Sequence, residues 1–215
     1  PWLLKENGRA NLRINKKKFI YLISPNKICS DFYQNLKLVL KTGKVSFFQL
    51  RLKNYSQKNK ILIGKIIKNI CKKNKVRFII NDDPLLALKL DADGCHLGQK
   101  DMNIKIAKKI LGKKIIGITC HNSVNLAKKA IKAKADYIAF GAFNRSRTKK
   151  TKHLASVKIL NKIKKFTKTP TVAIGGINAV NYKNLLLNNA NFLAISSYIW
   201  KNKKYKPLQA IERLK

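Results

Sequence analysis

Acidic side chains are scarce in this chain, which carries 9 Asp and Glu residues against 48 Lys and Arg residues and a formal net charge of +39. Arginine is scarce too, because only 7 of the 48 bases are Arg. A large positive charge is typical of nucleic-acid binding, since neutralised phosphates supply most non-specific affinity. Here, however, Lys, Asn and Ile recur together over nearly every expected helix, and their codons share adenine and thymine. We therefore interpret the charge mainly as coding bias on solvated faces. It predicts no specific nucleic-acid partner but attraction for anionic metabolites.

Cysteine pairs and long apolar runs are also missing. The four cysteines form no CxxC pair and no Cys/His cluster with zinc spacing, so they predict reduced thiols and a cytoplasmic setting. The longest apolar runs are far too short to span a bilayer. The first residues lack a signal-peptide core followed by small cleavage residues. We expect no membrane association.

Apolar, β-rich runs recur every 20 to 30 residues or so, and a segment of helical period follows each of them. The runs cover residues 19–24, 45–50, 76–80, 93–98, 114–119, 136–141, 171–176 and 192–197. The helical segments cover residues 31–42, 56–74, 84–90, 103–111, 123–133, 154–166, 178–188 and 205–214. Eight even units in 215 residues favour a single (β/α)₈ TIM barrel over an open α/β sheet. We expect an N-terminal extension over 1–17 and a catalytic barrel over 18–215.

A barrel of this kind places its chemistry at the carboxyl ends of the strands. The residues expected there are Gln49, Arg51, Lys53, Asn81, Asp82, Gln99, Asp101, Thr119, His121, the loop 144–149, Gly175, Gly176, Ser196 and Ser197. The set combines cationic side chains, two carboxylates, hydroxyls and turns that lead into helices. Such groups together are typical of a site for phosphorylated ligands.

Asp82 and Asp101 follow two successive apolar runs separated by a short helical segment that begins with proline. A βα unit lays its two strands parallel and brings their carboxyl ends together. Two aspartates there can share one Mg²⁺ that keeps its waters and binds phosphates. The alternative is a helix cap and a solvated turn.

Alternation in QLRLK (49–53) points Gln49, Arg51 and Lys53 the same way, while the leucines between them pack behind. The basic loop 144–150 could close over an anion. The Gly and Ser pairs after the last two strands could bind phosphate through backbone N–H groups. The alternatives are a surface charge pair, a solvated loop and a tight turn. His121 could be a general base or a histidine bonded near a helix start, while His96 is expected to pack.

Eight motifs follow one another along the chain: QLRLK (49–53), IINDDPLLAL (79–88), ADGCHLGQKD (92–101), GITCHNS (117–123), ADYIAFGAF (135–143), RTK (147–149), VAIGGIN (172–178) and AISS (194–197). As a set they resemble the thiamine phosphate synthase family from about residue 19 to residue 200. The resemblance implies a Mg²⁺-dependent barrel transferase. It would join 4-amino-5-hydroxymethyl-2-methylpyrimidine diphosphate to 4-methyl-5-(2-hydroxyethyl)thiazole phosphate and release pyrophosphate.

The resemblance also implies roles for individual residues. The pyrimidine diphosphate would be held by Gln49, Arg51, Lys53, Asn81, Thr119 and Lys149, of which Arg51, Lys53 and Lys149 would be catalytic. Mg²⁺ would be held by Asp82 and Asp101. The thiazole phosphate would be surrounded by Ser146, Thr148, Gly176, Ser196 and Ser197.

The chain departs from the family pattern at three places. Leu52 stands where the family often has Glu, Thr119 stands where Ser is usual, and NRSRTK (144–149) replaces a Phe-Pro-Thr-x-Thr-Lys pattern. An alternative enzyme class is a thiazole tautomerase on the same barrel, which needs proton transfer but no metal-held diphosphate. A non-enzymatic alternative is a nucleic-acid-binding protein. The sequence leaves open whether the protein forms a homo-oligomer.

Overall fold

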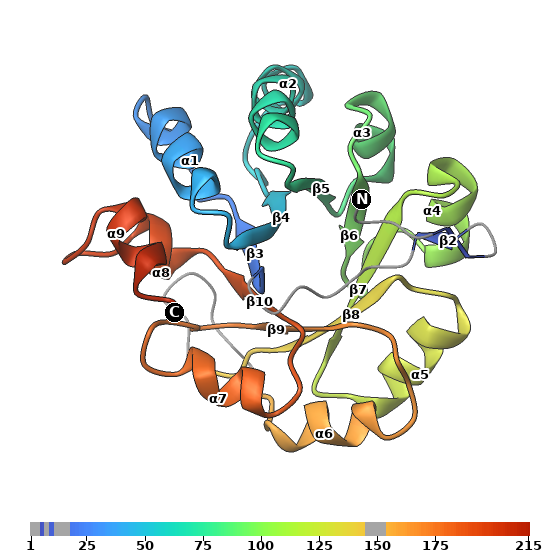
Figure 1. The fold of residues 1–215 in the computed structure, drawn as a ribbon. Helices are drawn as coiled ribbons and strands as arrows, with labels where there is room; N and C mark the ends of the chain where they lie inside the picture. The colour runs from blue at the N-terminus through green and yellow to red at the C-terminus, as the bar shows by residue number, and fades with distance from the viewer. Residues whose placement is uncertain (1–4, 7–8, 11–17, 145–153) are drawn as a thin grey trace.

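Eight parallel strands close into a barrel in the computed structural model, which describes residues 5–6, 9–10, 18–144 and 154–215. The strands follow one another around the barrel in chain order, and the last of them pairs with the first. Helices surround this barrel on the outside, as Figure 1 shows. The predicted (β/α)₈ TIM barrel is confirmed.

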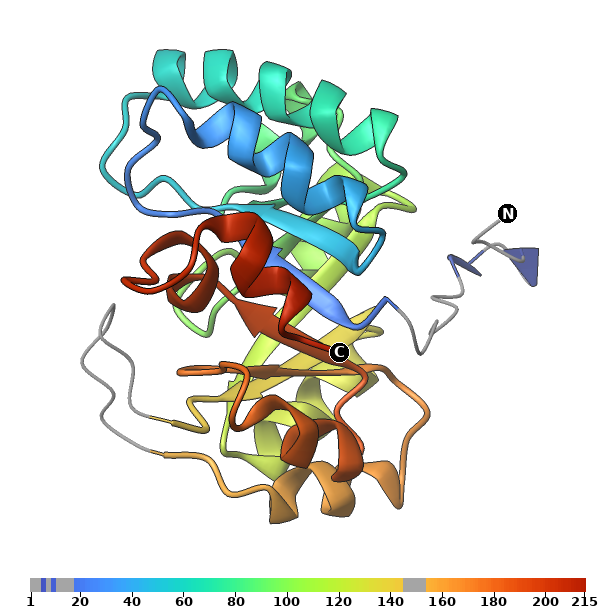
Figure 2. The same ribbon diagram turned by 60° about the vertical axis from the view of Figure 1, so that its left-hand side comes forward.

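The strands and helices occupy the runs that the sequence predicts. The barrel strands are β3 (Ile20–Ile23), β4 (Val45–Leu50), β5 (Arg77–Asn81), β6 (Gly94–Leu97), β7 (Ile115–His121), β8 (Tyr137–Gly141), β9 (Thr171–Ile174) and β10 (Phe192–Ile195). The helices are α1 (Phe32–Lys41), α2 (Gln57–Lys73), α3 (Pro84–Lys89), α4 (Ile104–Leu111), α5 (Val124–Lys132), α6 (Lys158–Lys164), α7 (Tyr182–Leu187), α8 (Ser197–Trp200) and α9 (Pro207–Glu212). Two further short strands, β1 (Lys5–Glu6) and β2 (Arg9–Ala10), pair antiparallel with each other and take no part in the barrel (Figure 2).

Two of the predicted helices, 154–166 and 178–188, begin later in the structure, as α6 and α7, and the short helix α8 was not predicted. Helix α7 starts at Tyr182 because Asn178 and Asn181 form a polar turn: the Asn178 Oδ1 accepts the N–H of Val180, and the Asn181 Oδ1 accepts that of Asn178. Asparagine side chains compete for backbone groups in this way and favour turns over helix. The unpredicted α8 is one turn that starts directly after β10. Its Trp200 Nε1 donates to the Ile23 carbonyl at 2.7 Å and ties the turn to β3.

The buried apolar side chains form two layers, one on each side of the barrel wall. Inside the barrel lie side chains that alternate along each strand, such as Tyr21 and Ile23 of β3. The larger layer fills the space between the outside of the barrel and the helices. Leu52, at 5% exposed, belongs to this outer layer and therefore faces away from the barrel interior. The apolar replacement of the family's Glu is thus accommodated by apolar packing.

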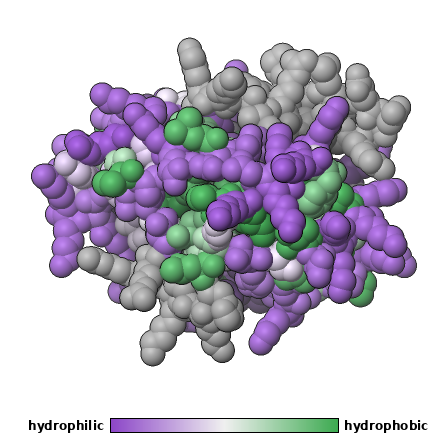
Figure 3. All heavy atoms as spheres, turned by 90° about the horizontal axis from the view of Figure 1, so that it is seen from below, coloured by the Kyte–Doolittle hydropathy of each residue, from purple (hydrophilic) through white to green (hydrophobic). Residues whose placement is uncertain are grey.

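Hydrophilic side chains cover most of the surface seen in Figure 3, with apolar side chains gathered near its centre. Within the described part of the chain, the ion pairs use Asp82, Asp91, Asp93 and Asp136. The described lysines are exposed or half-buried, as the sequence predicts. Among the helices that the structure describes, none is long and apolar enough to cross a membrane.

Candidate active site

Polar side chains meet at the carboxyl ends of β4 and β5. Gln49 is buried at 2% exposed, and its Nε2 donates to the Asn81 Oδ1 at 3.0 Å. Both residues occupy inward positions of adjacent strands, so the alternation of each strand directs them into the barrel mouth. The structure thus brings these two predicted site residues into direct contact at the barrel mouth.

Arg51 is held at the same mouth by two residues that the sequence did not single out. Its backbone N–H donates to Ser24 Oγ at 2.9 Å, and its Nη1 donates to Asn26 Oδ1 at 3.1 Å. Ser24 and Asn26 follow β3, the strand next to β4. A guanidinium fixed by neutral partners keeps its full charge and its remaining donors for an anion.

Asp82 and its neighbour Asp83 have separate roles. The Asp82 carboxylate pairs with the Lys53 ammonium at 3.2 Å, and its backbone adopts a left-handed φ of +66°. The His96 carbonyl holds this bend by accepting the Asp82 N–H at 2.8 Å. Asp83, by contrast, caps α3, since its Oδ1 accepts the Leu86 N–H at 2.9 Å. The helix-cap alternative therefore applies to Asp83 and leaves Asp82 for the mouth of the barrel.

Asp101 reaches the same place from the turn after β6. Its Oδ2 accepts the Gly98 N–H at 2.6 Å. Partial burial raises the pKa of the Asp101 carboxyl, and the adjacent Asp82 carboxylate raises it further, against the opposing effects of the Gly98 N–H and Lys53. Two carboxylates that repel each other in this way mark a place where a cation would be bound favourably.

The donor set of this carboxylate pair fits Mg²⁺. In the described part of the chain, no group of three or more His, Cys, Asp and Glu residues could hold a metal ion. A cation between Asp82 and Asp101 would therefore complete its shell with water and ligand oxygens. Mg²⁺ typically binds through one or two carboxylates, several waters and substrate phosphates. The predicted metal residues are thus brought together in a suitable form.

The raised pKa of Asp101 predicts a pH dependence that Mg²⁺ reverses. Because the folded protein binds the Asp101 proton more tightly than the unfolded chain does, this contribution to stability is present at low pH. It is lost as the pH rises from the ordinary aspartate pKa through the raised one. Mg²⁺ competes with the same proton, so its stabilising effect should grow over that window. Thermal denaturation of the protein and of Asp101→Asn, with and without MgCl₂, measures both effects, and equal pH profiles for the two proteins would contradict the prediction.

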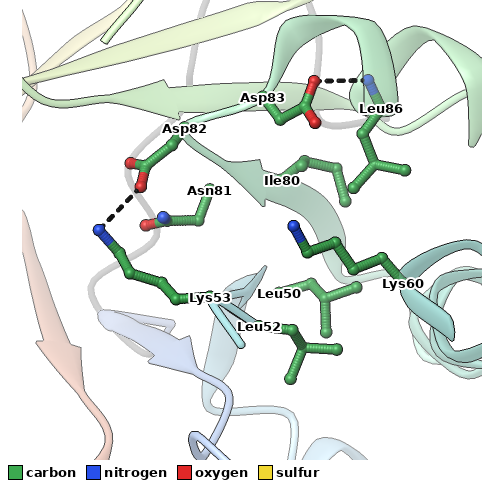
Figure 4. A pocket seen from close by; sticks show the side chains of 9 residues that line it. All are labelled: Leu50, Leu52, Lys53, Lys60, Ile80, Asn81, Asp82, Asp83 and Leu86. Atoms are coloured by element: carbon green, nitrogen blue, oxygen red, sulfur yellow. Dashed lines mark hydrogen bonds and ion pairs between the residues drawn. The ribbon is translucent and has the colours of Figure 1, made fainter. Parts of the chain in front are cut away.

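A pocket of about 190 Å³ opens beside Asp82. Figure 4 shows Lys53 and Asp82 facing each other on one side, with Asn81 near them and Lys60 of α2 on the other side. Leu50, Leu52, Ile80 and Leu86 form its apolar wall. The pocket thus joins the charged strand ends to the layer between barrel and helices.

Thr119, on the inward face of β7, is held at both its side chain and its backbone. Its Oγ1 lies 2.8 Å from His96 Nε2, and its carbonyl accepts from the Gln99 amide. Burial lowers the pKa of His96 to about 4, so its imidazole is neutral near pH 7. His96 packs inside the barrel as predicted, but its hydrogen bonds to the site were missed. His121 is exposed and ends β7 with a φ of +51°.

The opposite side of the mouth is formed by the turns after β8, β9 and β10. Gly175 and Gly176 have φ of +103° and +60°, and a Cβ on Gly175 would lie 2.3 Å from the Ala142 Cβ. Only glycine fits this close approach. Asn144 donates its N–H to the Gly175 carbonyl at 3.2 Å, which places the start of the 144–149 loop beside this turn.

Ser196 and Ser197 lie next to β3, since Ser196 Oγ donates to the Ser24 carbonyl at 3.2 Å. They begin α8. The remaining predicted site residues, Ser146, Thr148 and Lys149, lie outside the described residues.

Comparison with known proteins agrees with this arrangement. A family model described as thiamine monophosphate synthase matches residues 20–199. The chain is 66% identical over 204 residues to a thiamine-phosphate synthase of Pelagibacter ubique, covering 94% of this chain and 98% of that protein. A thiamine-phosphate synthase of Erythrobacter litoralis is 39% identical over 196 residues, with 89% and 92% covered.

Solved structures give the same result. The thiamine phosphate pyrophosphorylase from Pyrococcus furiosus superposes with a TM-score of 0.81 at 29% identity, covering 92% of this chain and 94% of that one. A 3-hexulose-6-phosphate synthase, at 14% identity and a TM-score of 0.62, shares the fold alone. The family match spans all eight barrel strands and the strand ends that carry the site. This chain therefore belongs to the thiamine monophosphate synthase family and is a transferase.

Proposed function

We propose that this protein joins 4-amino-5-hydroxymethyl-2-methylpyrimidine diphosphate to 4-methyl-5-(2-hydroxyethyl)thiazole phosphate, forming thiamine phosphate and pyrophosphate with Mg²⁺ as cofactor. The observation that carries the proposal is the pairing of Lys53 with Asp82 beside the protonation-prone Asp101. Two carboxylates for a cation and two cationic side chains for a diphosphate meet there, since Arg51 precedes Lys53 on the same strand end. The family and the names of the relatives support the same reaction.

The pyrimidine diphosphate would be bound on the β4–β7 side of the mouth. We assign it to Gln49, Arg51, Lys53, Asn81, Thr119 and Lys149. Gln49 and Asn81 form a neutral pair suited to the edge of a heterocycle, whereas Arg51 and Lys53 are suited to phosphate oxygens. When Asp82 ligates Mg²⁺, Lys53 would exchange its carboxylate partner for the diphosphate.

The chain's residues would act by stabilising charge on the leaving group. Mg²⁺, held by Asp82 and Asp101, would neutralise charge on the diphosphate when bound. Arg51, Lys53 and Lys149 would receive the charge that grows on pyrophosphate as the carbon–oxygen bond breaks. The pyrimidine amine donates electron density to the resulting benzyl-like cation, and the thiazole nitrogen attacks it. No protein nucleophile is required.

The thiazole phosphate would be bound on the β8–β10 side, by Ser146, Thr148, Gly176, Ser196 and Ser197. The left-handed backbone at Gly176 and the first turn of α8 expose N–H groups that have no intrahelical acceptor. This side faces the carboxylate pair across the barrel mouth, because β9 and β10 lie opposite β5 and β6 in the strand order. The two phosphorylated substrates would thus enter from opposite sides.

Incubation of the protein with both substrates and Mg²⁺ tests the proposal directly. We expect thiamine phosphate and pyrophosphate in equal amounts, and no product when Mg²⁺ is removed by chelation. A tautomerase would convert a thiazole substrate without the pyrimidine diphosphate and without Mg²⁺. Turnover of that kind, with no thiamine phosphate, would overturn the proposal.

The loop after β8 predicts different effects for two of its bases. Lys149 is assigned to the leaving pyrophosphate, so Lys149→Ala should lower kcat more than it raises KM. Arg145 has no counterpart in the family pattern, so Arg145→Ala should mainly raise KM, and the rise should shrink at high salt because long-range attraction is screened. Steady-state kinetics at low and high salt measure both. A collapse of kcat for Arg145→Ala with little effect of Lys149→Ala would reverse the loop assignment.

Three further proposals follow from the sequence and the family. Residues 1–17 form an extension to a catalytic domain at 18–215, the protein acts in the cytoplasm, and it binds no specific nucleic acid. Light scattering would decide whether it forms a homo-oligomer.

A further inference from the structure

A continuous chain of hydrogen-bonding side chains crosses the barrel interior and ends at Thr119. Tyr21 Oη lies 2.7 Å from Tyr137 Oη, Tyr137 Oη lies 3.0 Å from His96 Nδ1, and His96 Nε2 lies 2.8 Å from Thr119 Oγ1. Tyr21, Tyr137 and His96 are buried at 2%, 1% and 7% exposed, while Thr119 is half-buried at the mouth. The chain therefore links the deep interior to the site.

The strand register builds this chain. His96, Gly117 and Tyr137 are paired across β6, β7 and β8 in one row. Because Gly117 has no side chain, the Tyr137 ring occupies its place, and a Cβ there would lie 1.9 Å from Tyr137 Cζ. The His96 and Tyr137 rings stack at 5.6 Å with 16° between their planes. One glycine thus lets the two rings meet across an intervening strand.

The donors and acceptors available on these side chains determine the direction of their hydrogen bonds. Within the described residues, the hydrogen-bond partner of Tyr21 Oη is Tyr137. If Thr119 donated to His96 Nε2, then His96 Nδ1–H would donate to Tyr137, and Tyr137 would donate to Tyr21. The Tyr21 proton would then have no acceptor. In the other direction Tyr21 donates to Tyr137, Tyr137 donates to Nδ1 and Nε2–H donates to Thr119. Each donor of Tyr21, Tyr137 and His96 in this series then has an acceptor, which strongly favours this arrangement because an unmade buried hydrogen bond is costly.

We propose that His96 is a positioning residue that is fixed as the Nε2–H tautomer by Tyr137 and donates to Thr119, so that the Thr119 hydroxyl proton stays free for the substrate. The hydroxyl keeps one lone pair as well. A free donor and a free acceptor on one oxygen match an aminopyrimidine edge, where an amine N–H lies next to a ring nitrogen. The substrate part of this inference rests on the proposed function; the tautomer does not.

Nuclear magnetic resonance tests the tautomer in the intact protein. The protein has 3 His residues, so long-range ¹H–¹⁵N correlations of the side chains can be assigned by single substitutions. We expect His96 to show a protonated Nε2 and an unprotonated Nδ1. Tyr137→Phe should shift the Nδ1 resonance of His96. Tyr182→Phe should not shift it, because the Tyr182 hydroxyl donates to the Lys215 carbonyl and takes no part in these hydrogen bonds. A protonated Nδ1 in the wild type would overturn the proposal.

A double-mutant cycle tests whether His96 acts through Thr119. His96→Leu should lower kcat/KM for the pyrimidine substrate about tenfold or more without raising KM for the thiazole phosphate, and His96→Gln, which keeps a donor near Nε2, should recover most of it. In a Thr119→Val background, His96→Leu should cause no further loss. Independent, multiplicative losses would overturn the positioning role. If His96→Leu does not fold, His96→Asn, whose short amide leaves no donor near the Nε2 position, replaces it in the cycle. Absence of thiamine phosphate formation by the wild type would instead count against the proposed function, and the resonance test would still decide the tautomer.

Discussion

Replacing Asp82 by Asn should abolish most Mg²⁺-dependent turnover while the barrel stays folded. Asn removes the charge yet tolerates the left-handed backbone at φ +66°, which Ala does not. Losing a ligand of a charge-stabilising cation should cost roughly 3 kcal/mol of transition-state stabilisation, or about 10²-fold in kcat/KM. Asp101→Asn should act similarly. Titration of activity with Mg²⁺ measures the loss, together with the shift in the concentration needed for half-maximal rate.

Asp83 supplies the matched control for this experiment, since it is the next residue and also an acid. Its carboxylate caps α3 through the Leu86 N–H, so Asp83→Ala should cost about 1 kcal/mol of unfolding free energy. The activity of Asp83→Ala should depend on Mg²⁺ in the same way as that of the unsubstituted protein. If Asp83→Ala lost Mg²⁺ activation and Asp82→Asn kept it, the metal assignment would be wrong, and Asp82 would be only the ion-pair partner of Lys53.

The second large effect is expected at Gly117, inside the barrel. Gly117→Ala would place its Cβ 1.9 Å from Cζ of the Tyr137 ring, which is 1% exposed and cannot move into solvent. Overpacking of a dense core typically costs 1–3 kcal/mol and occasionally more, and we expect at least about 3 kcal/mol here because a rigid ring must shift. Denaturant unfolding measures this free energy. The His96 and Thr119 contacts should be lost along with the ring position.

Two further variants separate this clash from a general glycine effect. Gly64→Ala in α2 also brings a Cβ to 2.5 Å from another atom, but that atom is the flexible Leu90 Cδ1 end, and Ala favours a helix. It should change stability by less than about 1 kcal/mol. Gly117→Ala combined with Tyr137→Leu should be more stable than Gly117→Ala alone. If removing the ring brought no recovery, the contact with Tyr137 would not be the cause of the loss.

Much of the site could be predicted from the sequence because its signals are local. Alternation along 49–53 places Gln49 and Arg51 on one face, and the structure has Gln49 buried inward and Leu52 in the outer layer. Asn81 and Asp82 end a strand of buried residues, and Asp101 follows the next one. Period-2 burial and the parallel βα connection are sufficient to bring such residues to one end of a barrel.

The sequence by itself determined the barrel, its strand ends and the residues found there, because hydrophobic period and turn chemistry act within a few residues of the chain. The sequence pattern already assigned Asp82 rather than Asp83 to the metal, but only the tertiary structure gives the physical reason, since the His96 carbonyl accepts the Asp82 N–H while the Asp83 carboxylate caps α3. The tertiary structure also decided the series of hydrogen-bonded side chains inside the barrel. Tyr21 and Tyr137 are 116 residues apart and meet only because the barrel closes, and Tyr137 reaches His96 only because register places Gly117 between them. Closure and register depend on the packing of all eight strands together, which no local pattern contains.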